Sequence, residues 1–520
     1  MRSSRYRSTI ATLLGREKQV RSLPDGGELR VCLAYPNSYR VGMASLGFQV
    51  VRRLFARAGC RVERTFMPGA AEERGLGAAA GPLVAWESLE PPGRFELLAF
   101  SVPFELDYTN LVRMLLLSGL PPRAADRHQD HPLVIAGGAA ATINPRPLSP
   151  FLDAVVLGES ERPLPLLAET VSELRGDRVA LLGALAELPG VYVPALHDDP
   201  ESRRLEPPLL LPADIALSDA VSADAEFGES VLMEVGRGCS MGCRFCWAGW
   251  ACRPPRGHDL EAMLAAVDTL PPESDRIGLI ASSHFDHPQF MDLIRGLRRR
   301  GKRLAVSALR IDQLDDELLA CLAESGTRSV ALAPETGCES LRRRVGKRIS
   351  DEQVVDAAHR VAEAGLRSLK LYFLVGLPGE TAADVEAIPD LVGRIAEAAG
   401  GRLRLSLSVN IFIPKPGTPW GGEPLAAERE LRRRLRRLRR GLSCLPGLEV
   451  ATMAPWEAVL QTLLGRGGEE LGELLLRAAE EGWSLRRLRD EAPPEWIERY
   501  VYGGGLQAGG RTAGAAEDIG

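Results

Sequence analysis

The 520-residue chain lacks any apolar run approaching the roughly 18 residues that a membrane-spanning helix needs. Its first residues, Met1 to Arg7, lack the apolar core of a signal peptide. The formal net charge is only -5 at pH 7, so global electrostatics indicate no polyanionic partner. The nine cysteines include three that are bunched together, a pattern typical of metal binding rather than of a disulfide framework. We therefore expect a cytoplasmic protein that has no membrane partner.

The chain is long enough, and apolar enough at 45%, to build two or three domains. Strand-like apolar runs alternate with helical patterns, which predicts an α/β fold with parallel sheets. We expect an N-terminal extension, a Rossmann-like domain of flavodoxin type with a linker, a partial (β/α)6 TIM-like barrel, a helical C-terminal region and a disordered tail. These segments are expected at residues 1–28, 29–215, 216–420, 421–502 and 503–520, respectively.

The strand predictions come from short apolar runs bounded by turn residues. In the first domain the main runs are 29–35, 97–102, 133–136 and 154–157, with one short strand at 191–193 in the linker. In the barrel they are 231–235, 277–281, 304–307, 329–333, 369–374 and 403–409. The carboxyl ends of these strands are where ligands bind in both kinds of sheet.

A glycine-rich loop after the first barrel strand carries Cys239, Cys243 and Cys246. Three thiolates on a loop can hold three corners of a cubane iron–sulfur cluster and leave one iron open, whereas most clusters have four cysteine ligands. One face of a helix has the same spacing, but glycines at 236, 238 and 242 would each cost a helix about 1 kcal/mol. A zinc site needs four ligands, and the nearest spare thiol is Cys252. Core cysteines and zinc are the less favoured alternatives.

The spacing C-x3-C-x2-C, with Phe245 before the third cysteine, resembles the signature of the radical S-adenosylmethionine (radical SAM) superfamily. In that family the open iron binds the amino and carboxylate groups of SAM. One electron from the cluster then cleaves SAM to methionine and a 5′-deoxyadenosyl radical. The resemblance therefore implies a [4Fe-4S] cluster, SAM as cofactor and a reductant such as flavodoxin or ferredoxin as partner.

The resemblance also implies SAM contacts at the carboxyl ends of the barrel strands. The family often has Gly-Gly-Glu after the second strand, and Ser282 or Ser283 would have to supply an oxygen there instead. The glutamate of Pro334-Glu335-Thr336 is the first choice for the ribose. The complete set of expected SAM-binding residues is Ser282, Ser283, Ser307, Arg310, Glu335, Gly376, Gly379 and Glu380.

Other polar residues at these strand ends have ordinary interpretations beside the functional ones. Arg310 has two interpretations, a bidentate contact with a carboxylate of SAM and a surface salt bridge. His284 and His287 are interpreted as polar capping residues in preference to acid–base or metal-binding groups. Cys338 is more readily a small buried residue than a thiol that faces substrate.

The N-terminal domain resembles the cobalamin-binding domain that precedes many radical SAM domains. The resemblance lies in Gly137-Gly138 after one strand and in Gly158 after the next. Cobalamin domains that ligate cobalt carry a D-x-H-x-x-G loop, whereas this chain has Asn37-Ser-Tyr-Arg-Val-Gly42. Corrinoid bound without a protein histidine is the favoured interpretation, and an empty relic of such a domain is the alternative. Several motifs, among them Arg64-Thr-Phe66-Met-Pro68, resemble a group of uncharacterised radical SAM proteins.

The predicted function is that of a radical SAM enzyme, with cobalamin-dependent methyl transfer or a related radical modification of an unknown substrate. One alternative is modification of RNA or a ribosomal component, suggested by the arginines of residues 428–440. A solvated helix whose leucines pack on the barrel is the favoured interpretation of that segment. The last alternative is a non-catalytic iron–sulfur or zinc scaffold.

Overall fold

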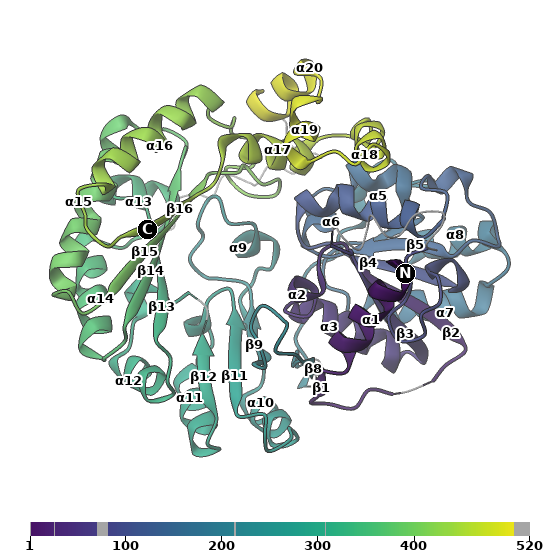
Figure 1. Ribbon diagram of the computed structural model, residues 1–520, viewed down its shortest axis with the longest axis horizontal. Helices are drawn as coiled ribbons and strands as arrows, with labels where there is room; N and C mark the ends of the chain where they lie inside the picture. The colour runs from purple at the N-terminus through teal and green to yellow at the C-terminus, as the bar shows by residue number, and fades with distance from the viewer. Residues whose placement is uncertain (1, 25, 70–81, 213–214, 307, 504–520) are drawn as a thin grey trace. The chain divides into compact units, whose positions relative to one another are not determined.

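The computed structural model describes residues 2–24, 26–69, 82–212, 215–306 and 308–503, and the chain forms two compact units (Figure 1). Unit 1 contains the chain up to Pro208, Ala216–Val231 and Gly467–Ala492. Unit 2 contains Leu209–Ile215, Leu232–Arg466 and the chain from Pro493 onward. Both units have strands and helices in alternation, which confirms the predicted α/β class.

Unit 1 is built on a six-stranded sheet with the order β3-β2-β4-β5-β6-β7. The first five strands in this order are parallel, and β7 runs antiparallel to β6. Counted along the chain, the parallel strands have the order 2-1-3-4-5 that is typical of flavodoxin-like sheets. The strands are β2 (Leu29–Tyr35), β3 (Cys60–Phe66), β4 (Leu97–Ser101), β5 (Leu133–Gly137), β6 (Ala154–Val156) and β7 (Val191–Tyr192).

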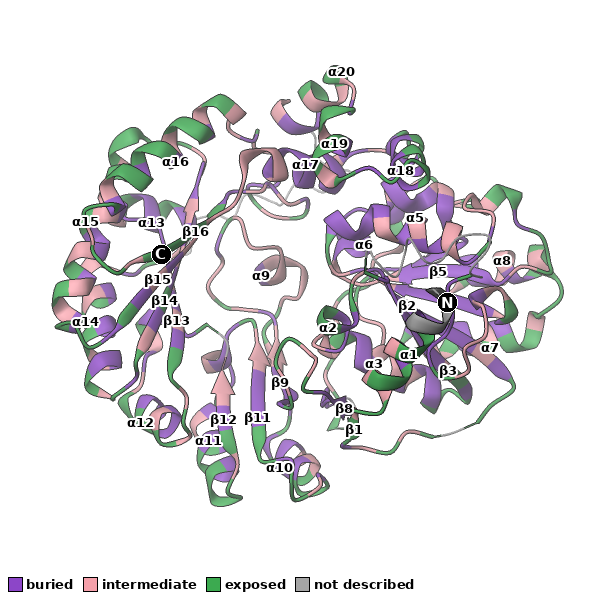
Figure 2. Cartoon of the chain, viewed as in Figure 1, coloured by how far each residue is buried: buried purple, intermediate pink, exposed green. Residues whose placement is uncertain are grey.

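Helices cover this sheet, so the strands are buried almost throughout, as Figure 2 shows. Helix α3 packs against α7, and both contact β2, whereas α5 packs against α18 from the C-terminal part of the chain. The helices of unit 1 are α1 (Arg2–Leu14), α2 (Tyr39–Gly42), α3 (Leu46–Arg57), α5 (Tyr108–Leu117), α6 (Ala139–Ile143), α7 (Pro163–Leu174), α8 (Arg178–Glu187), α18 (Leu471–Glu480) and α19 (Leu485–Asp490).

The polar N-terminal segment supplies a counter-ion, Glu17, for a buried arginine of this sheet. Strand β1 (Lys18–Gln19) pairs antiparallel with β8 (Ala220–Val221), which places Glu17 beside the sheet. The guanidinium of Arg64, 2% exposed, bonds Glu17 at 2.9 Å and Glu87 at 2.7 Å. Because a buried cation is stable only when it is paired, Glu17 and Glu87 together allow Arg64 to occupy the sheet.

Unit 2 contains two four-stranded sheets, β10-β9-β11-β12 and β13-β14-β15-β16. A parallel bridge between Leu309 and Leu332 joins them. Within the described residues, no pairing joins the outer strands β10 and β16, so the arc of strands is open. The strands are β9 (Val231–Arg237), β10 (Arg256–Gly257), β11 (Arg276–Ala281), β12 (Arg303–Val306), β13 (Ser329–Glu335), β14 (Ser368–Val375), β15 (Arg404–Ile411) and β16 (Glu449–Thr452).

All six strands predicted for the barrel are present, and the structure adds β10 and β16. Strands β14 and β15 alternate between buried and partly exposed residues, which indicates one covered face and one more open face. The helices are α9 (Trp247–Ala251), α10 (Leu260–Asp268), α11 (Phe290–Arg299), α12 (Asp316–Glu324), α13 (Glu339–Val345), α14 (Asp351–Glu363), α15 (Ala382–Ala399), α16 (Glu428–Leu442), α17 (Pro455–Arg466) and α20 (Pro494–Trp496).

Local sequence explains where the helices of unit 2 begin. Ser350 and Gln353 form a reciprocal capping box at the start of α14, and Thr381 and Asp384 do the same for α15. In the part of the chain that the structure describes, no helix is both long and apolar enough to span a bilayer.

Candidate functional site

The three clustered cysteines lie on a loop between β9 and α9, which Figure 1 shows inside the arc of strands of unit 2. Residues 238–246 are not helical, so the interpretation as one face of a helix is wrong. Gly238 and Gly242 have φ angles of 82° and 69°, which glycine adopts without strain. A side chain at Gly236 would lie 2.5 Å from the carbonyl of Arg256, so the neighbouring strand also excludes one.

The three thiols lie in buried or partly buried surroundings. Cys243 is buried, and Cys239 and Cys246 are partly buried. Burial raises the pKa of Cys243 to about 12, and the nearby Lys347 opposes that rise. Cys239 and Cys246 each interact electrostatically with Cys243, so the three thiols lie near one another. Among the described residues no three potential ligands converge on a single metal ion, whereas each thiolate of a cubane binds a separate iron.

The cysteine loop is anchored to the segments that follow β11 and β12. Asp286, which follows β11, accepts hydrogen bonds from the backbone N–H of Ser240 at 2.7 Å and from its hydroxyl at 2.6 Å. Arg310, which follows β12, donates to the same hydroxyl at 3.2 Å and to Asp286 at 3.1 Å. Arg310 also pairs with Asp312 at 2.6 Å. The guanidinium of Arg310 therefore braces the cysteine loop.

Glu335 ends β13 at an irregularity in the pairing with β14, and its φ of 67° is unusual for a residue with a side chain. Its carboxylate accepts a hydrogen bond from Lys347 at 2.6 Å, and Lys347 also donates to the carbonyl of Ala333 at 2.8 Å. Burial by itself would lower the pKa of Lys347, but the charges of Glu335 and Cys243 outweigh it and the pKa is raised. Lys347 is therefore a largely buried ammonium group between the expected SAM-binding carboxylate and the cysteine loop.

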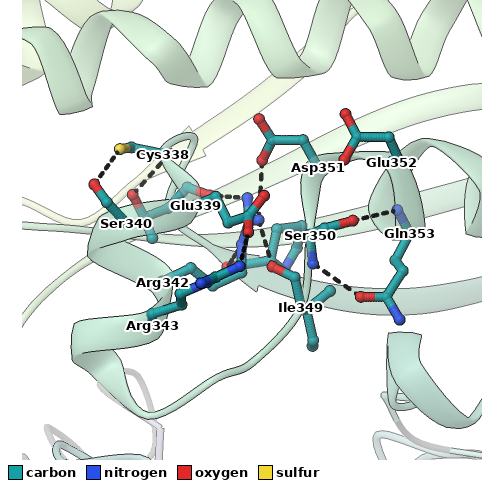
Figure 3. A network of polar contacts seen from close by, with 12 residues as sticks. Cys338, Glu339, Ser340, Arg342, Arg343, Ile349, Ser350, Asp351, Glu352 and Gln353 are labelled. Atoms are coloured by element: carbon teal, nitrogen blue, oxygen red, sulfur yellow. Dashed lines mark hydrogen bonds and ion pairs between the residues drawn. The ribbon is translucent and has the colours of Figure 1, made fainter.

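Helix α13 holds this pair in place through Arg342, whose contacts with Ile349 and Asp351 appear in Figure 3. Arg342 is fully buried and donates to the carbonyls of Pro334 and Thr336, on either side of Glu335, at 3.2 and 2.9 Å. It also donates to the carbonyl of Ile349 at 2.8 Å and to Asp351 at 2.9 Å. One side chain thus fixes both the strand end and the turn that carries Lys347.

Cys338 opens the same helix and is partly buried. Its thiol lies 3.0 Å from the hydroxyl of Ser340. It packs against a hydrophobic cluster formed by Leu341, Val345, Leu377, Phe412 and Trp420. The packing agrees with a small apolar role.

The loop after β14 brings Gly376, Gly379 and Glu380 together. The carboxylate of Glu380 accepts from the backbone N–H of Gly376 at 2.8 Å and pairs with Arg434 of α16 at 2.7 Å. Burial raises the pKa of Glu380 to about 7. A side chain at Gly376 would lie 2.7 Å from Leu431 of α16. Gly376 and Glu380 join the loop to α16. The carboxylate of Glu380 thus fixes the conformation of the loop.

The residues after β11 and β12 have different surroundings. Ser282 is exposed, whereas Ser283 is buried and its hydroxyl has no hydrogen-bond partner among the described residues. Nε2 of His284 lies 3.1 Å from the carbonyl of Leu279, and Nε2 of His287 lies 2.7 Å from that of His258. Both imidazoles thus contact backbone carbonyls, as the capping interpretation expects. Ser307 lies outside the described residues.

The glycines expected to contact a corrinoid lie at strand ends of unit 1 but differ in surroundings. A side chain at Gly138 would lie 2.8 Å from the backbone of Val102, so protein packing explains that glycine. Gly137 is in ordinary contact with Val156. Gly158, with a φ of 85°, has open space beside its Cα, and its N–H donates to Thr142. Open space at Gly158 is compatible with a ligand beside the backbone.

The loop that lacks a histidine has its own polar contacts. Asn37 donates to Asp107 at 2.8 Å, and Asn110 donates to the carbonyl of Pro36 at 2.9 Å. Burial raises the pKa of Asp107 to about 6. Tyr39 stacks on Trp86 with ring centroids 5.0 Å apart. The loop is therefore ordered by protein contacts and offers no imidazole.

Sequence reasoning missed the residues that join the cysteine loop to its surroundings: Ser240, Asp286, Arg342 and Lys347. A signal for Arg342 was present. Cys338, Leu341, Arg342 and Val345 have the spacing of one face of a helix, so Arg342 belongs to the face that packs inward. No comparable pattern marks Lys347.

Two family profiles match the chain. Residues 47–194 match the family described as radical SAM proteins, N-terminal, and residues 233–392 match the radical SAM superfamily. The three cysteines, Arg310, Glu335 and Glu380 lie within the second match.

The chain is similar to two archaeal proteins. An uncharacterized protein of Methanocaldococcus jannaschii is 26% identical over 86% of this chain and 90% of its own length. An uncharacterized methyltransferase of Pyrococcus horikoshii is 24% identical over 51% of this chain and 58% of its own length.

Among solved structures, the fold is shared with the radical SAM methyltransferase TsrM of Kitasatospora setae. The TM-score is 0.51 at 16% identity, covering 76% of this chain and 75% of that one. The cobalamin-dependent SAM radical enzyme OxsB, with aqua-cobalamin bound, has a TM-score of 0.50 at 13% identity, covering 90% of this chain and 74% of that one.

Proposed function

The chain belongs to the radical SAM superfamily, and on that premise we propose that it is a cobalamin-dependent enzyme that methylates, or otherwise modifies by radical chemistry, an unidentified substrate. The observation that carries the proposal is the cysteine loop. Cys239, Cys243 and Cys246 lie near one another on this loop, which is hydrogen-bonded to Asp286 and Arg310 after β11 and β12 and to Val345 of α13. Three thiol ligands suit a [4Fe-4S] cluster with one iron left for SAM.

When bound, such a cluster supplies the electron that cleaves SAM to methionine and a 5′-deoxyadenosyl radical. The chain's own residues would hold and orient the reactants. Ser283 has a buried hydroxyl available for the amino group of SAM. Glu335 has a carboxylate that Lys347 fixes in place, suited to the hydroxyls of a ribose. In this arrangement Arg310 acts by keeping the cysteine loop in position, since its guanidinium is already bonded to Asp286 and Asp312.

Three observations support the corrinoid. The sheet of unit 1 has flavodoxin order, and ligands bind at the carboxyl ends of such strands. Gly158, at one of these ends, leaves open space beside the backbone. The fold is shared with OxsB, which is described with aqua-cobalamin bound. Because residues 37–42 contain no histidine, we expect the cobalt to have no protein imidazole ligand from this loop.

Methyl transfer is supported by names that relatives carry. The Pyrococcus horikoshii relative is called a methyltransferase, and TsrM is called a radical SAM methyltransferase. These names do not identify the substrate of this chain, which has to be determined by experiment.

Anaerobic reconstitution with iron and sulfide tests the proposal, using protein from cells grown with cobalamin. We expect the spectrum of a [4Fe-4S] cluster, bound corrinoid, and 5′-deoxyadenosine or S-adenosylhomocysteine after addition of SAM and dithionite. Protein that binds the cluster but no corrinoid would refute cobalamin dependence. Protein that cleaves no SAM would instead support the scaffold alternative.

Modification of RNA is the second candidate, because a relative in Anaplasma marginale, 25% identical over 39% of this chain and 47% of its own length, is named a tRNA-2-methylthio-N(6)-dimethylallyladenosine synthase. Helix α16 offers a limited basic surface for this. Its leucines 431, 435, 438 and 442 are buried. Arg432, Arg433, Arg434 and Arg437 are paired with glutamates. Much of the positive charge of the helix is thus neutralised within the protein.

Charge reversal on α16 tests RNA binding by this helix. We expect the triple variant Arg432→Glu, Arg436→Glu, Arg439→Glu to bind bulk RNA as the unaltered protein does, because the helix serves as scaffold. The measurement is RNA affinity as a function of salt concentration. A helix that contacts phosphates would instead lose affinity, and the slope of log K against log salt would fall by roughly 3. Circular dichroism of the variant controls for loss of the helix.

A further inference from the structure

The proposed function uses Lys347 only to hold Glu335 in place, and it assigns no consequence to the charge of this largely buried ammonium group. The side chains of Lys347 and Glu335 are 12% and 11% exposed, and their charged atoms are 2.6 Å apart. Lys347 interacts electrostatically with Cys243 and Cys246 as well as with Glu335. A lysine held this far from water is costly unless the charges around it compensate.

The backbone around Lys347 is joined to the cysteine loop directly. The N–H of Arg244, next to Cys243, donates to the carbonyl of Val345 at 2.8 Å. Gly346 has a φ of 100°, and a side chain there would lie 2.8 Å from the carbonyl of Gly242. The turn that carries Lys347 therefore packs against the loop that carries the cysteines, and Arg342 fixes the other side of this turn.

The charges around the thiols give this lysine a specific consequence. Three thiolates bring three negative charges into a partly buried site. Reduction adds one more electron, so a nearby fixed cation stabilises the reduced state more than the oxidised state. Near Cys239, Arg310 is balanced by Asp286 and Asp312, whereas near Cys243 the cation is Lys347 and its counter-ion is Glu335.

We propose that Lys347 is a positioning residue that makes the cysteine-bound cluster easier to reduce and fixes the carboxylate of Glu335 beside it. This inference rests on the proposed function, because it requires a cluster on Cys239, Cys243 and Cys246. It assigns opposite electrostatic effects to the two members of one ion pair. The cation favours entry of the electron and the carboxylate opposes it.

The test is the midpoint potential of the reconstituted cluster in the full chain at pH 7 without SAM, by electrochemical titration followed by electron paramagnetic resonance. We expect Lys347→Met to lower the equilibrium constant for one-electron reduction at least about tenfold, which corresponds to about 59 mV. Lys347→Arg should retain most of the potential, because it keeps the charge. Glu335→Gln should raise the potential, because it removes the opposing charge.

Arg348→Met is the matched control. It removes a cation from the adjacent position, but Arg348 is exposed, so solvent screens its charge and we expect the potential to stay near that of the unaltered protein. Iron content shows which variants retain the cluster. If Lys347→Met does not assemble a cluster, the midpoint potential of Glu335→Gln becomes the test, and a rise in that potential would support the electrostatic role of the ion pair.

Two kinds of failure are distinguishable. Unaltered protein that binds no cluster, or forms no 5′-deoxyadenosine, would refute the proposed function. Unaltered protein that does both, with the same potential in Lys347→Met or Glu335→Gln, would overturn the role of Lys347 alone. Equal changes of the midpoint potential in Lys347→Met and Arg348→Met would also overturn the role of Lys347, since the low exposure of Lys347 would then make no difference to the potential.

Discussion

Replacing any one of Cys239, Cys243 and Cys246 by alanine is expected to abolish SAM cleavage and to remove most of the cluster iron. With two thiolates left on the loop, a cubane loses one of its three protein corners, and iron–sulfur clusters depend on cysteine thiolates for retention. Each of the three neighbouring thiols is expected to bind one iron of the same cluster, so each substitution should have the same effect. Iron and sulfide content, the visible spectrum and 5′-deoxyadenosine formation measure the outcome after anaerobic reconstitution.

Cys252→Ala and Cys444→Ala are the controls for this result. Cys252 lies just beyond α9 and is partly buried like two of the presumed ligands, whereas Cys444 is exposed. We expect both variants to keep the iron and the activity of the unaltered protein. Loss of metal in Cys252→Ala would indicate a fourth cysteine ligand, as in a structural zinc site, and would contradict an open iron.

The sequence predicted the sheets of both units because most strands are short apolar runs bounded by turns. Strand β3 is an exception, since it contains Arg61, Glu63 and Arg64 and reads as polar. Arg64 is buried there only because Glu17 and Glu87 neutralise it, and Glu17 lies 47 residues away along the chain. Strand β16 was missed for a different reason, because its four residues are mostly exposed and form no apolar run.

The sequence predicted where most residues of the candidate site lie, but it did not predict their hydrogen-bond and ion-pair partners. The cysteine spacing located the loop, and the resemblance located Glu335 and Arg310 at strand ends. Neither could show that Arg310 braces Ser240 or that Glu380 pairs with Arg434, because those partners come from distant segments. Lys347 illustrates the limit well, since a lysine in a polar stretch reads as exposed until the fold places it beside Cys243.

Replacing Arg342 by leucine is expected to destabilise unit 2 by about 3 kcal/mol or more, because three carbonyls lose a fully buried donor and each buried group left unsatisfied costs about 1–3 kcal/mol. The change leaves the carbonyls of Pro334, Thr336 and Ile349 without this donor, whereas Asp351, whose side chain is 26% exposed, keeps Arg394 at 3.5 Å. Urea unfolding measures the free energy, and hydrogen exchange of β13 and the turn after α13 locates the loss. The free energy of unfolding of Arg342→Lys should lie between those of Arg342→Leu and the unaltered protein, because lysine keeps the charge but lacks the planar fork of donors.

Arg343→Leu provides the matched comparison, since it makes the same substitution one residue along the same helix. The side chain of Arg343 is 68% exposed and pairs with Glu339 four residues earlier. Exposed pairs of this kind contribute about 0–1 kcal/mol, so this variant should unfold almost as the unaltered protein does. Equal destabilisation by both variants would show that helix α13 tolerates leucine poorly and that the buried contacts of Arg342 are not what fixes Glu335. If only Arg342→Leu loses stability together with exchange protection around Glu335, one arginine on the inward face of α13 orders the strand end and the lysine turn at once.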